Sequence, residues 1–322
     1  VFVYQNIQFP AFPGLMCTNV YTRSLSRSMD VQSGYSELVS AYADGKFQVY
    51  FLADEIELVQ NEYTKVICRE LRCERAEKEF AESALKLDFL NDREKTRQES
   101  RAMDNNALAH LIDHITCYYH EAVYWVEPTM FALEMGDFGG VKKLFMNWMN
   151  AAYPSVSDAY KQSYFAILCL PTQKSFVQAS EEHLGRIALL PHTEQAAAIA
   201  DYISRYYWLK YDYYGPILND SDVQEDLKRL TALGGDELEH HVENVALMSQ
   251  RQQQILEHTL ATLALPENLA RAFHNIRGFA YLYADKKKAT LSQLNVGIGI
   301  VLAEIGQRFQ LSERALHYAA IE

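Results

Sequence analysis

The stretch LSQLNVGIGIVLAEI, residues 291–305, carries the clearest periodic pattern in the chain. Its large aliphatic side chains recur at alternating steps of three and four residues, at Leu291, Leu294, Ile298, Val301 and Ile305. This spacing puts them on one face of an α-helix, as in a helix that packs against partner helices. The stretch therefore predicts a helical core, and we expect the helix to end near Leu311-Ser312.

Two glycines in the same stretch, Gly297 and Gly299, superficially resemble a nucleotide-binding loop. A dinucleotide fingerprint needs a preceding strand and a third glycine three residues after the second. Position 302 is Leu302, and the pattern around it is helical. We therefore expect these glycines to let neighbouring helices approach closely.

Helical patterns also fill most of the chain before this stretch. Apolar residues recur at helical spacing from Asp54 onward, and proline or paired glycines mark the breaks. Asp54, Thr172 and Thr193 are the expected N-caps of three of these helices. The predicted helices cover residues 54–71, 104–126, 128–150, 155–169, 172–189, 193–210, 219–233 and 236–263, and a final short helix begins at Ser312.

Strand composition is confined to the beginning of the chain. VFVYQ (1–5) and KFQVYFL (46–52) are rich in β-branched and aromatic residues, and Asp44-Gly45 predicts a turn before the second. A short helix is expected around residues 31–43. The predicted fold class is therefore mostly α, a multi-helix bundle with a short β-hairpin or strand pair near the N-terminus.

The charged stretch from Arg69 to Arg101 separates these two parts. Its dense opposite charges indicate a solvated helix or a loose connection near Asn91-Asp92. We expect residues 1–100 to form an N-terminal strand and helix segment packed on the bundle. Residues 101–322 then form the helical domain, unless both make one continuous domain.

Composition and charge limit the classes of partner. The 322 residues include 42 Asp and Glu against 30 Lys and Arg, for a formal net charge of −12. Because nucleic acids and anionic membranes attract Lys and Arg, neither is an expected partner. No apolar run reaches the roughly 20 residues that span a bilayer. The five scattered cysteines and the lack of a signal-peptide pattern predict reduced thiols and a cytoplasmic location.

Two histidine patterns deserve comparison with metal sites. His110 and His114 lie four residues apart, but the glutamate of an HExxH motif is missing and no third ligand is evident. Glu237 and His240 have the spacing used in di-iron bundles, which need that motif twice. A metal-dependent helical oxygenase is therefore the least favoured function, and no metal site is predicted. No nucleophile motif is present either, so no catalytic residue is predicted.

The run RYYWLKYDYYGPI (205–217) gathers aromatic side chains just before a turn. Tyrosine joins an apolar ring to a hydroxyl group, which suits half-buried surfaces and pockets. The candidate ligand-binding residues are Tyr207, Trp208, Tyr211 and Tyr214. In the alternative interpretation, Trp208 and Tyr211 simply seal the core beside the Gly-Pro turn.

One basic cluster interrupts the acidic chain, at Arg277, Lys286, Lys287 and Lys288. An exposed, solvated helix face is one interpretation. The other is an anion or domain contact, in which these residues meet phosphate or the acidic surface of a partner.

Two of these stretches resemble phosphoenolpyruvate (PEP)-utilising phosphotransferases of the PEP synthase and rifampin phosphotransferase type. RYYWLKYDYYGPILNDSDVQEDLKRL (205–230) is similar to a segment in which an aromatic helix end, a Gly-Pro turn and a capped helix follow one another. RAFHNIRGFAYLYADKKKATLSQLNVGIGIVLAEIGQRFQLS (271–312) looks like the helix pair that comes next in those proteins. DGKFQVYFLADEIE (44–57) is similar, more weakly, to the start of the same region.

In that family an ATP-grasp region makes a phosphohistidine on a swivelling domain, and the helical region precedes that domain. In members like rifampin phosphotransferase the helical region binds the acceptor. The present sequence has no Gly-rich ATP-grasp segment, and Thr116-Cys117-Tyr118 lacks the histidine of a phosphohistidine motif. The family's catalytic residues are therefore not carried over to this chain.

The resemblance implies a helical acceptor-binding or domain-organising region that is not catalytic by itself. Its implied partners are ATP-grasp and phosphohistidine domains, in the same or a neighbouring chain, and a small-molecule acceptor. ATP, PEP and Mg²⁺ are implied only for those missing domains, and no cofactor is expected in this chain. The alternative is a stand-alone all-α interaction or scaffold protein without a role in phosphotransfer.

Overall fold

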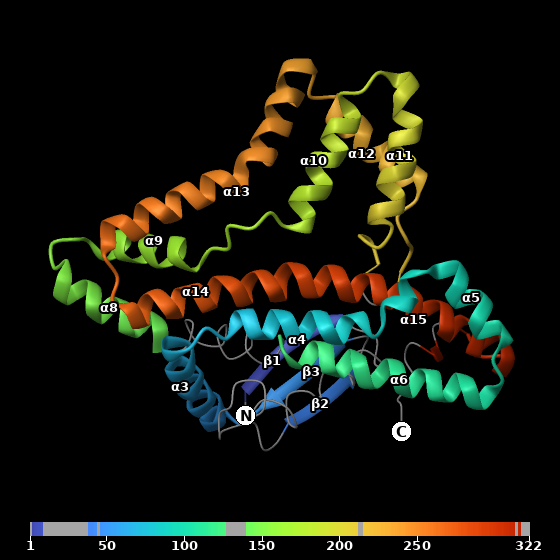
Figure 1. Cartoon of the computed structure of the whole chain (residues 1–322), viewed down its shortest axis with the longest axis horizontal. Helices are drawn as coiled ribbons and strands as arrows, with labels where there is room; N and C mark the ends of the chain where they lie inside the picture. The colour runs from blue at the N-terminus through green and yellow to red at the C-terminus, as the bar shows by residue number, and fades with distance from the viewer. Residues whose placement is uncertain are drawn as a thin grey trace.

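The computed structural model describes residues 2–8, 38–43, 46–126, 140–211, 215–312 and 315–316. Over these residues the protein is mostly helical, which confirms the predicted class (Figure 1). The candidate residue Tyr214 and the turn at Asp44-Gly45 lie outside the described residues. So do the first part of the helix predicted at 128–150 and most of the one predicted from Ser312.

One continuous helical rod, residues 267–309, forms the spine of the fold (Figure 1). It consists of α14 (Glu267–Tyr281), a π-helical segment (Leu282–Lys287) and α15 (Lys288–Phe309). The family resemblance implies a helix pair here, whereas the π-helical segment joins the two helices without a break. The periodic face of α15 is buried as predicted, at Leu291, Leu294, Ile298 and Val301.

The rod also corrects the expectation that no apolar segment reaches membrane-spanning length. By length and composition it could cross a bilayer, with a mean hydropathy of 1.3 in its most apolar window. In this structure other parts of the protein cover the helix, and 61% of that window is buried.

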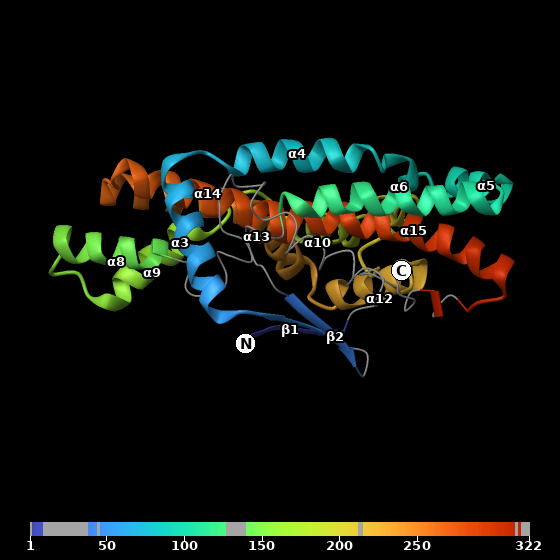
Figure 2. The ribbon, with the colours of Figure 1, turned by 90° about the horizontal axis from the view of Figure 1, so that it is seen from below.

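Shorter helices line the rod on the side seen in Figure 2. α3 (Ala53–Arg69) and α4 (Cys73–Leu85) contact α14, and α6 (Asn105–Tyr124) lies along α4. A 3₁₀ turn (Asp88–Asn91) and α5 (Arg93–Ala102) contact α15. The charged stretch between residues 69 and 101 is therefore ordered as two helices with a tight turn between them. At the other end of the rod, α8 (Gly140–Ala152) and α9 (Asp158–Cys169) pack near α14.

A helical arm projects from the rod (Figure 1). We define the arm as α10 (Phe176–Ala188), α11 (His192–Tyr206), α12 (Asp220–Thr231) and the first half of α13 (Gly235–Leu263). The second half of α13 returns to contact α9 beside the rod. The start of α10 is tied to the rod, because the Phe176 amide donates a hydrogen bond to the Asp285 carboxylate over 2.6 Å.

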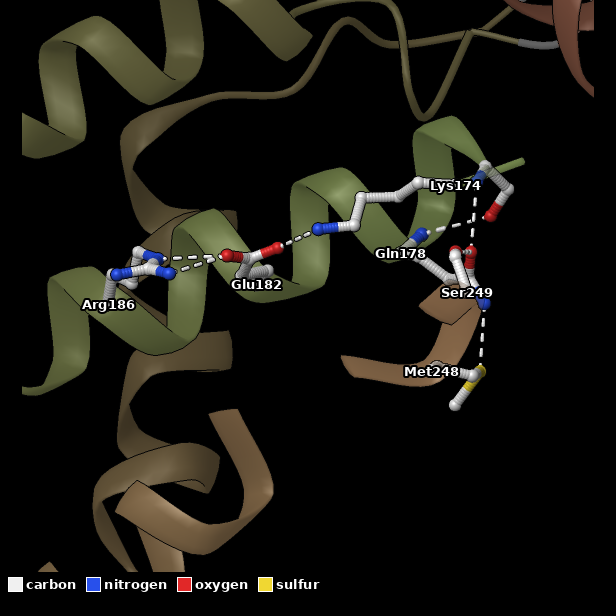
Figure 3. A network of polar contacts seen from close by, with 7 residues as sticks. Lys174, Gln178, Glu182, Arg186, Met248 and Ser249 are labelled. Atoms are coloured by element: carbon white, nitrogen blue, oxygen red, sulfur yellow. Dashed lines mark hydrogen bonds and ion pairs between the residues drawn. The ribbon is translucent and has the colours of Figure 1, made fainter. Parts of the chain in front are cut away.

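Polar contacts hold α10 against α13 within the arm (Figure 3). Gln178 donates from Nε2 to the sulfur of Met248 over 2.8 Å, and the Ser249 hydroxyl donates to Gln178 Oε1 over 3.4 Å. On the same helix, Glu182 accepts hydrogen bonds from Lys174 and Arg186. Those bonds hold the pKa of the Glu182 carboxyl below its usual value.

Among the described residues, the buried apolar side chains form three hydrophobic clusters. The first surrounds α14 and includes Phe145, Phe273 and Phe279. The second fills the arm and reaches the rod at Val296. The third surrounds α15 and joins Leu87 and Leu90 to residues beyond 100, such as Ile115 and Ile298. The division of the chain near residue 100 stays a prediction.

The helix starts differ from the expected caps at three places. α10 is capped by Ser175, not Thr172, through a capping box with Gln178. α11 begins at His192 after Pro191, so Thr193 lies inside the helix. α3 begins after Leu52, which leaves Asp54 in its first turn. The start predicted from the run NDSD is confirmed, because Asn219 forms a capping box at α12.

The N-terminal strands form one antiparallel sheet of order β1-β3-β2. β1 covers Phe2–Gln8, β2 covers Leu38–Ala43 and β3 covers Lys46–Phe51. The helix expected around residues 31–43 is therefore wrong over Leu38–Ala43, where the backbone pairs with β3 from Leu38↔Phe51 to Ala43↔Lys46. Cross-strand pairing outweighs the weak local helical pattern there.

Candidate functional site

The aromatic run lies where the arm meets the rod. α11 ends at Tyr206, and a turn carries the chain over residues 207–210. The chain then returns to the turn, because the Leu218 amide donates a hydrogen bond to the Tyr207 carbonyl over 2.8 Å. Because the chain turns back on itself here, neighbouring aromatic side chains of the run contact different helices.

Three of the four aromatic candidates can be placed, and all three are buried. Tyr207, Trp208 and Tyr211 are 9%, 4% and 6% exposed. The Trp208 ring packs against Phe176 with 5.1 Å between ring centroids, and its Nε1 donates to the Arg205 carbonyl over 3.1 Å. Trp208 and Tyr211 both belong to the hydrophobic cluster of the arm, as the alternative interpretation proposes.

Tyr207 and Tyr211 face the rod side of the junction. The Arg93 guanidinium lies 4.4 Å from the centroid of the Tyr207 ring, and burial raises the pKa of the Tyr207 hydroxyl. The Tyr211 hydroxyl lies directly against α15 at Gly299, where an added Cβ would be only 2.4 Å from the oxygen.

The close approach of a neighbouring helix predicted for the two glycines is confirmed at Gly297, whereas the neighbour of Gly299 is the side chain of Tyr211. At Gly297 an added Cβ would lie 2.4 Å from the carbonyl oxygen of Leu90. Because Gly297 has no side chain, the 3₁₀ turn before α5 can lie directly against α15. Gly299 leaves room in the same way for the Tyr211 hydroxyl. The two glycines bring α5 and the aromatic run to the same part of α15.

A pocket of about 250 Å³ opens at this meeting point. One wall is α5, which contributes Arg93, Arg97 and Arg101 at intervals of four residues and so from one helix face. The other wall is α15, whose Val296, Ile300 and Ala303 supply apolar surface. Tyr211 and Ile217 close one side, and Glu304 is also a lining residue.

Positive charge predominates in this pocket, which we call the arginine pocket. Among the described lining residues, three are arginines and one, Glu304, is a carboxylate. Glu304 is already engaged by Arg308, whose Nε donates to it over 2.8 Å, whereas Arg101 Nε lies 3.9 Å away. Arg97 pairs with the exposed Glu94, which is not among the lining residues.

The arginine helix is fixed at both ends. Asp92 caps α5 by accepting a hydrogen bond from the Lys95 amide over 3.0 Å. At the opposite end, Arg308 donates to the carbonyl oxygens of Ser100, Arg101 and Met103 over 2.7–3.1 Å. A cation is also favoured there by the helix dipole. The guanidinium groups of the pocket therefore project from a rigid element.

The basic cluster predicted from the sequence has other surroundings. Arg277 donates to the Leu168 carbonyl over 2.8 Å, and burial lowers its pKa. Lys286 pairs with Glu77, and Lys287 lies 3.7 Å from the centroid of the Tyr283 ring. Lys288 is exposed. Three of the four cations thus have partners within the protein.

The histidine pairs are exposed on their helices. His110 and His114 lie on α6, where the His114 ring contacts Tyr118 with 4.6 Å between centroids. Glu237 and His240 lie in the first turns of α13. Among the described residues, no group of three or more His, Cys, Asp or Glu side chains could hold a metal ion.

Sequence reasoning identified Tyr211 but missed the three arginines beside it. Their spacing was visible in the charged stretch, but a solvated helix face has the same spacing. They line a pocket only because α5 packs against α15, which comes about 200 residues later in the chain. Comparisons with protein-family models, curated proteins and solved structures find no match for this chain.

Proposed function

We propose that this chain is a helical acceptor-binding or domain-organising region of a PEP-utilising, phosphohistidine-type phosphotransferase, without transfer chemistry of its own. ATP-grasp and phosphohistidine domains, in the same or a neighbouring chain, would hold ATP, PEP and Mg²⁺. The proposed setting is the cytoplasm, with neither nucleic acid nor a membrane as a partner.

The observation that carries this proposal is the contact between Tyr211 and Gly299 beside the arginine pocket. These residues belong to the two stretches that resemble the family, residues 205–230 and 271–312. The stretches are far apart in the sequence, yet they meet at a pocket lined by both. A shared ligand site gives a physical reason for the two patterns to occur together.

The pocket also suits a small acceptor better than a reaction centre. Its described lining has cations, apolar side chains, a tyrosine hydroxyl and one carboxylate, Glu304, which is bound by Arg308, but neither histidine nor cysteine. Such a lining can bind and orient a molecule, while the phosphoryl group arrives on another domain. The helical bundle with its N-terminal strands would then be a rigid platform for that encounter.

Labelling with radioactive phosphate tests this division of labour. The purified chain is incubated with Mg²⁺ and either γ-labelled ATP or labelled PEP. A second sample contains the chain expressed together with the coding sequence that flanks it in the genome. We expect acid-labile phosphohistidine only in the second sample.

Two results would contradict the proposal. One is labelling of the isolated chain, because that would place transfer chemistry within these residues. The other is flanking sequence that encodes no ATP-grasp or phosphohistidine domain, together with no such neighbour in pull-downs. The second result would favour a stand-alone scaffold protein instead.

A further inference from the structure

We propose that the arginine pocket binds a small phosphomonoester, with its phosphate at Arg97 and Arg101 and its organic part against α15. This deepens the proposed function, because a phosphomonoester is what phosphoryl transfer to a hydroxyl acceptor yields. The binding itself rests on the pocket and can be tested independently.

The first argument is the cost of the arginine row in the absence of a ligand. Like charges four residues apart on a helix repel each other, and three guanidinium groups repeat that arrangement along α5. The chain as a whole is acidic, with a net charge of −12, so this row runs against the overall composition. An anion bound between the guanidinium groups would offset their mutual repulsion, because each group would then attract the anion.

The second argument is the size of the charge surplus. The described lining holds three arginines and one carboxylate, Glu304. Glu94, which pairs with Arg97, and Arg308, which pairs with Glu304, add one charge of each sign, so the lining and these partners together carry a surplus of two positive charges. A phosphomonoester carries about −1.5 to −2 charges at pH 7, which matches this surplus, whereas a carboxylate carries one. Guanidinium groups also bind phosphate oxygens through two parallel hydrogen bonds.

The third argument is the volume and the apolar wall. At about 250 Å³ the pocket is smaller than the roughly 300–1,000 Å³ of usual ligand pockets, so only a small molecule fits. Val296 and Ile300 on α15 provide apolar surface, and the Tyr211 ring adds to it at the side of the pocket. A ligand with a charged end and a compact apolar body satisfies both walls.

The test uses phenyl phosphate as the probe. Calorimetry and thermal unfolding of the purified chain are compared for phenyl phosphate, benzoate and phenol, with ionic strength matched by NaCl. We expect phenyl phosphate to bind with a stoichiometry of one and to raise Tm. Benzoate should bind about 10-fold more weakly or worse, and phenol should not bind measurably.

Charge-removing variants locate the site. Arg97→Gln and Arg101→Gln should each weaken phenyl phosphate binding by about 10-fold to 100-fold, because each removes charged hydrogen bonds to the phosphate. The matched control is Arg229→Gln on α12, an exposed arginine that pairs with Asp226, since neither residue is part of the pocket lining. It should bind like the wild type.

The same variants also report on folding. Without ligand, Arg97→Gln and Arg101→Gln should change Tm little. Each variant lowers the repulsion within the row but also removes a partly exposed ion pair, with Glu94 or with Glu304, and the two small effects oppose each other. A loss of binding with an intact Tm therefore supports the proposal. The proposal is overturned if phenyl phosphate does not bind, if benzoate binds as tightly, or if Arg229→Gln loses as much affinity as the pocket variants. None of these results changes the labelling experiment on the proposed function.

Discussion

At the scale of single residues, Ala264 is where residue type and backbone geometry conflict. It ends α13 in the left-handed region at φ 46°, and its amide still donates to the Leu260 carbonyl over 3.3 Å. The side chain of an L-residue is strained in this conformation, which glycine adopts without cost. The helix end is thus kept in place, against local preference, by its hydrogen bond and by the burial of the preceding Leu263.

We expect Ala264→Gly to stabilise the protein by about 1 kcal/mol, because it relieves that strain. Ala261→Gly is the matched control, since it makes the same substitution at an exposed, regular helical position three residues earlier. The control should destabilise by about 1 kcal/mol, because glycine is a poor helix former. Urea unfolding of both variants measures the two changes, and equal signs would contradict the assignment of the left-handed cap.

At the scale of elements, the sequence predicted what depends on local pattern. The buried face of α15, the capped start of α12 at Asn219 and the close helix contact at Gly297 all followed from spacing and residue type. The cap of α10 at Ser175 also has a local signal in the sequence, because Gln178 completes its capping box. Thr172, which follows a proline, has a similar signal and was predicted instead. The π-helical join was not readable, since no residue in LYADKK distinguishes it from an α-helical turn or a break.

The candidate site was only half predictable for a related reason. Tyr211 stood out because an aromatic run before a Gly-Pro turn is unusual on local grounds. Arg97 did not, because its neighbours in sequence are charged and its pocket wall comes from α15. A pattern of charges indicates a helix face, and tertiary contacts alone decide whether solvent or another helix covers that face.

The contact between α15 and the aromatic run yields a prediction at this scale. Gly299→Ala places a Cβ 2.4 Å from the Tyr211 hydroxyl oxygen, so we expect it to destabilise the protein by about 1–3 kcal/mol. In a Tyr211→Phe background the nearest ring carbon is 3.5 Å from that Cβ, an ordinary contact distance. Gly299→Ala should therefore cost much less there. Denaturant unfolding of the four proteins gives the coupling energy, and additive effects would show that the two residues do not touch.

At the scale of the whole molecule, the three hydrophobic clusters differ in how many buried residues of the rod they contain. α14 and α15 contribute many buried residues to the first and third clusters, including Phe273, Phe279 and Ile298. In the arm cluster, Val296 is the buried rod residue among those described. The Asp285 carboxylate adds a tether at the first turn of α10. The arm is therefore joined to the rod mainly at its base.

This arrangement predicts a gradient of stability within a single helix, α13. Its first half belongs to the arm through Leu238 and Val242, whereas its second half joins the first cluster through Leu256 and Leu263. Regions with fewer attachments open at lower free energy. Amides of residues 238–245 should therefore exchange with deuterium faster than those of residues 256–263, even though both lie in regular helix. Val296→Ala should speed exchange in the first half and leave the second half nearly unchanged, because it weakens the packing of the arm cluster on the rod. Exchange that is uniform along α13, measured by peptide mass spectrometry, would mean that arm and rod open together, and the junction at the arginine pocket would then be as rigid as the core.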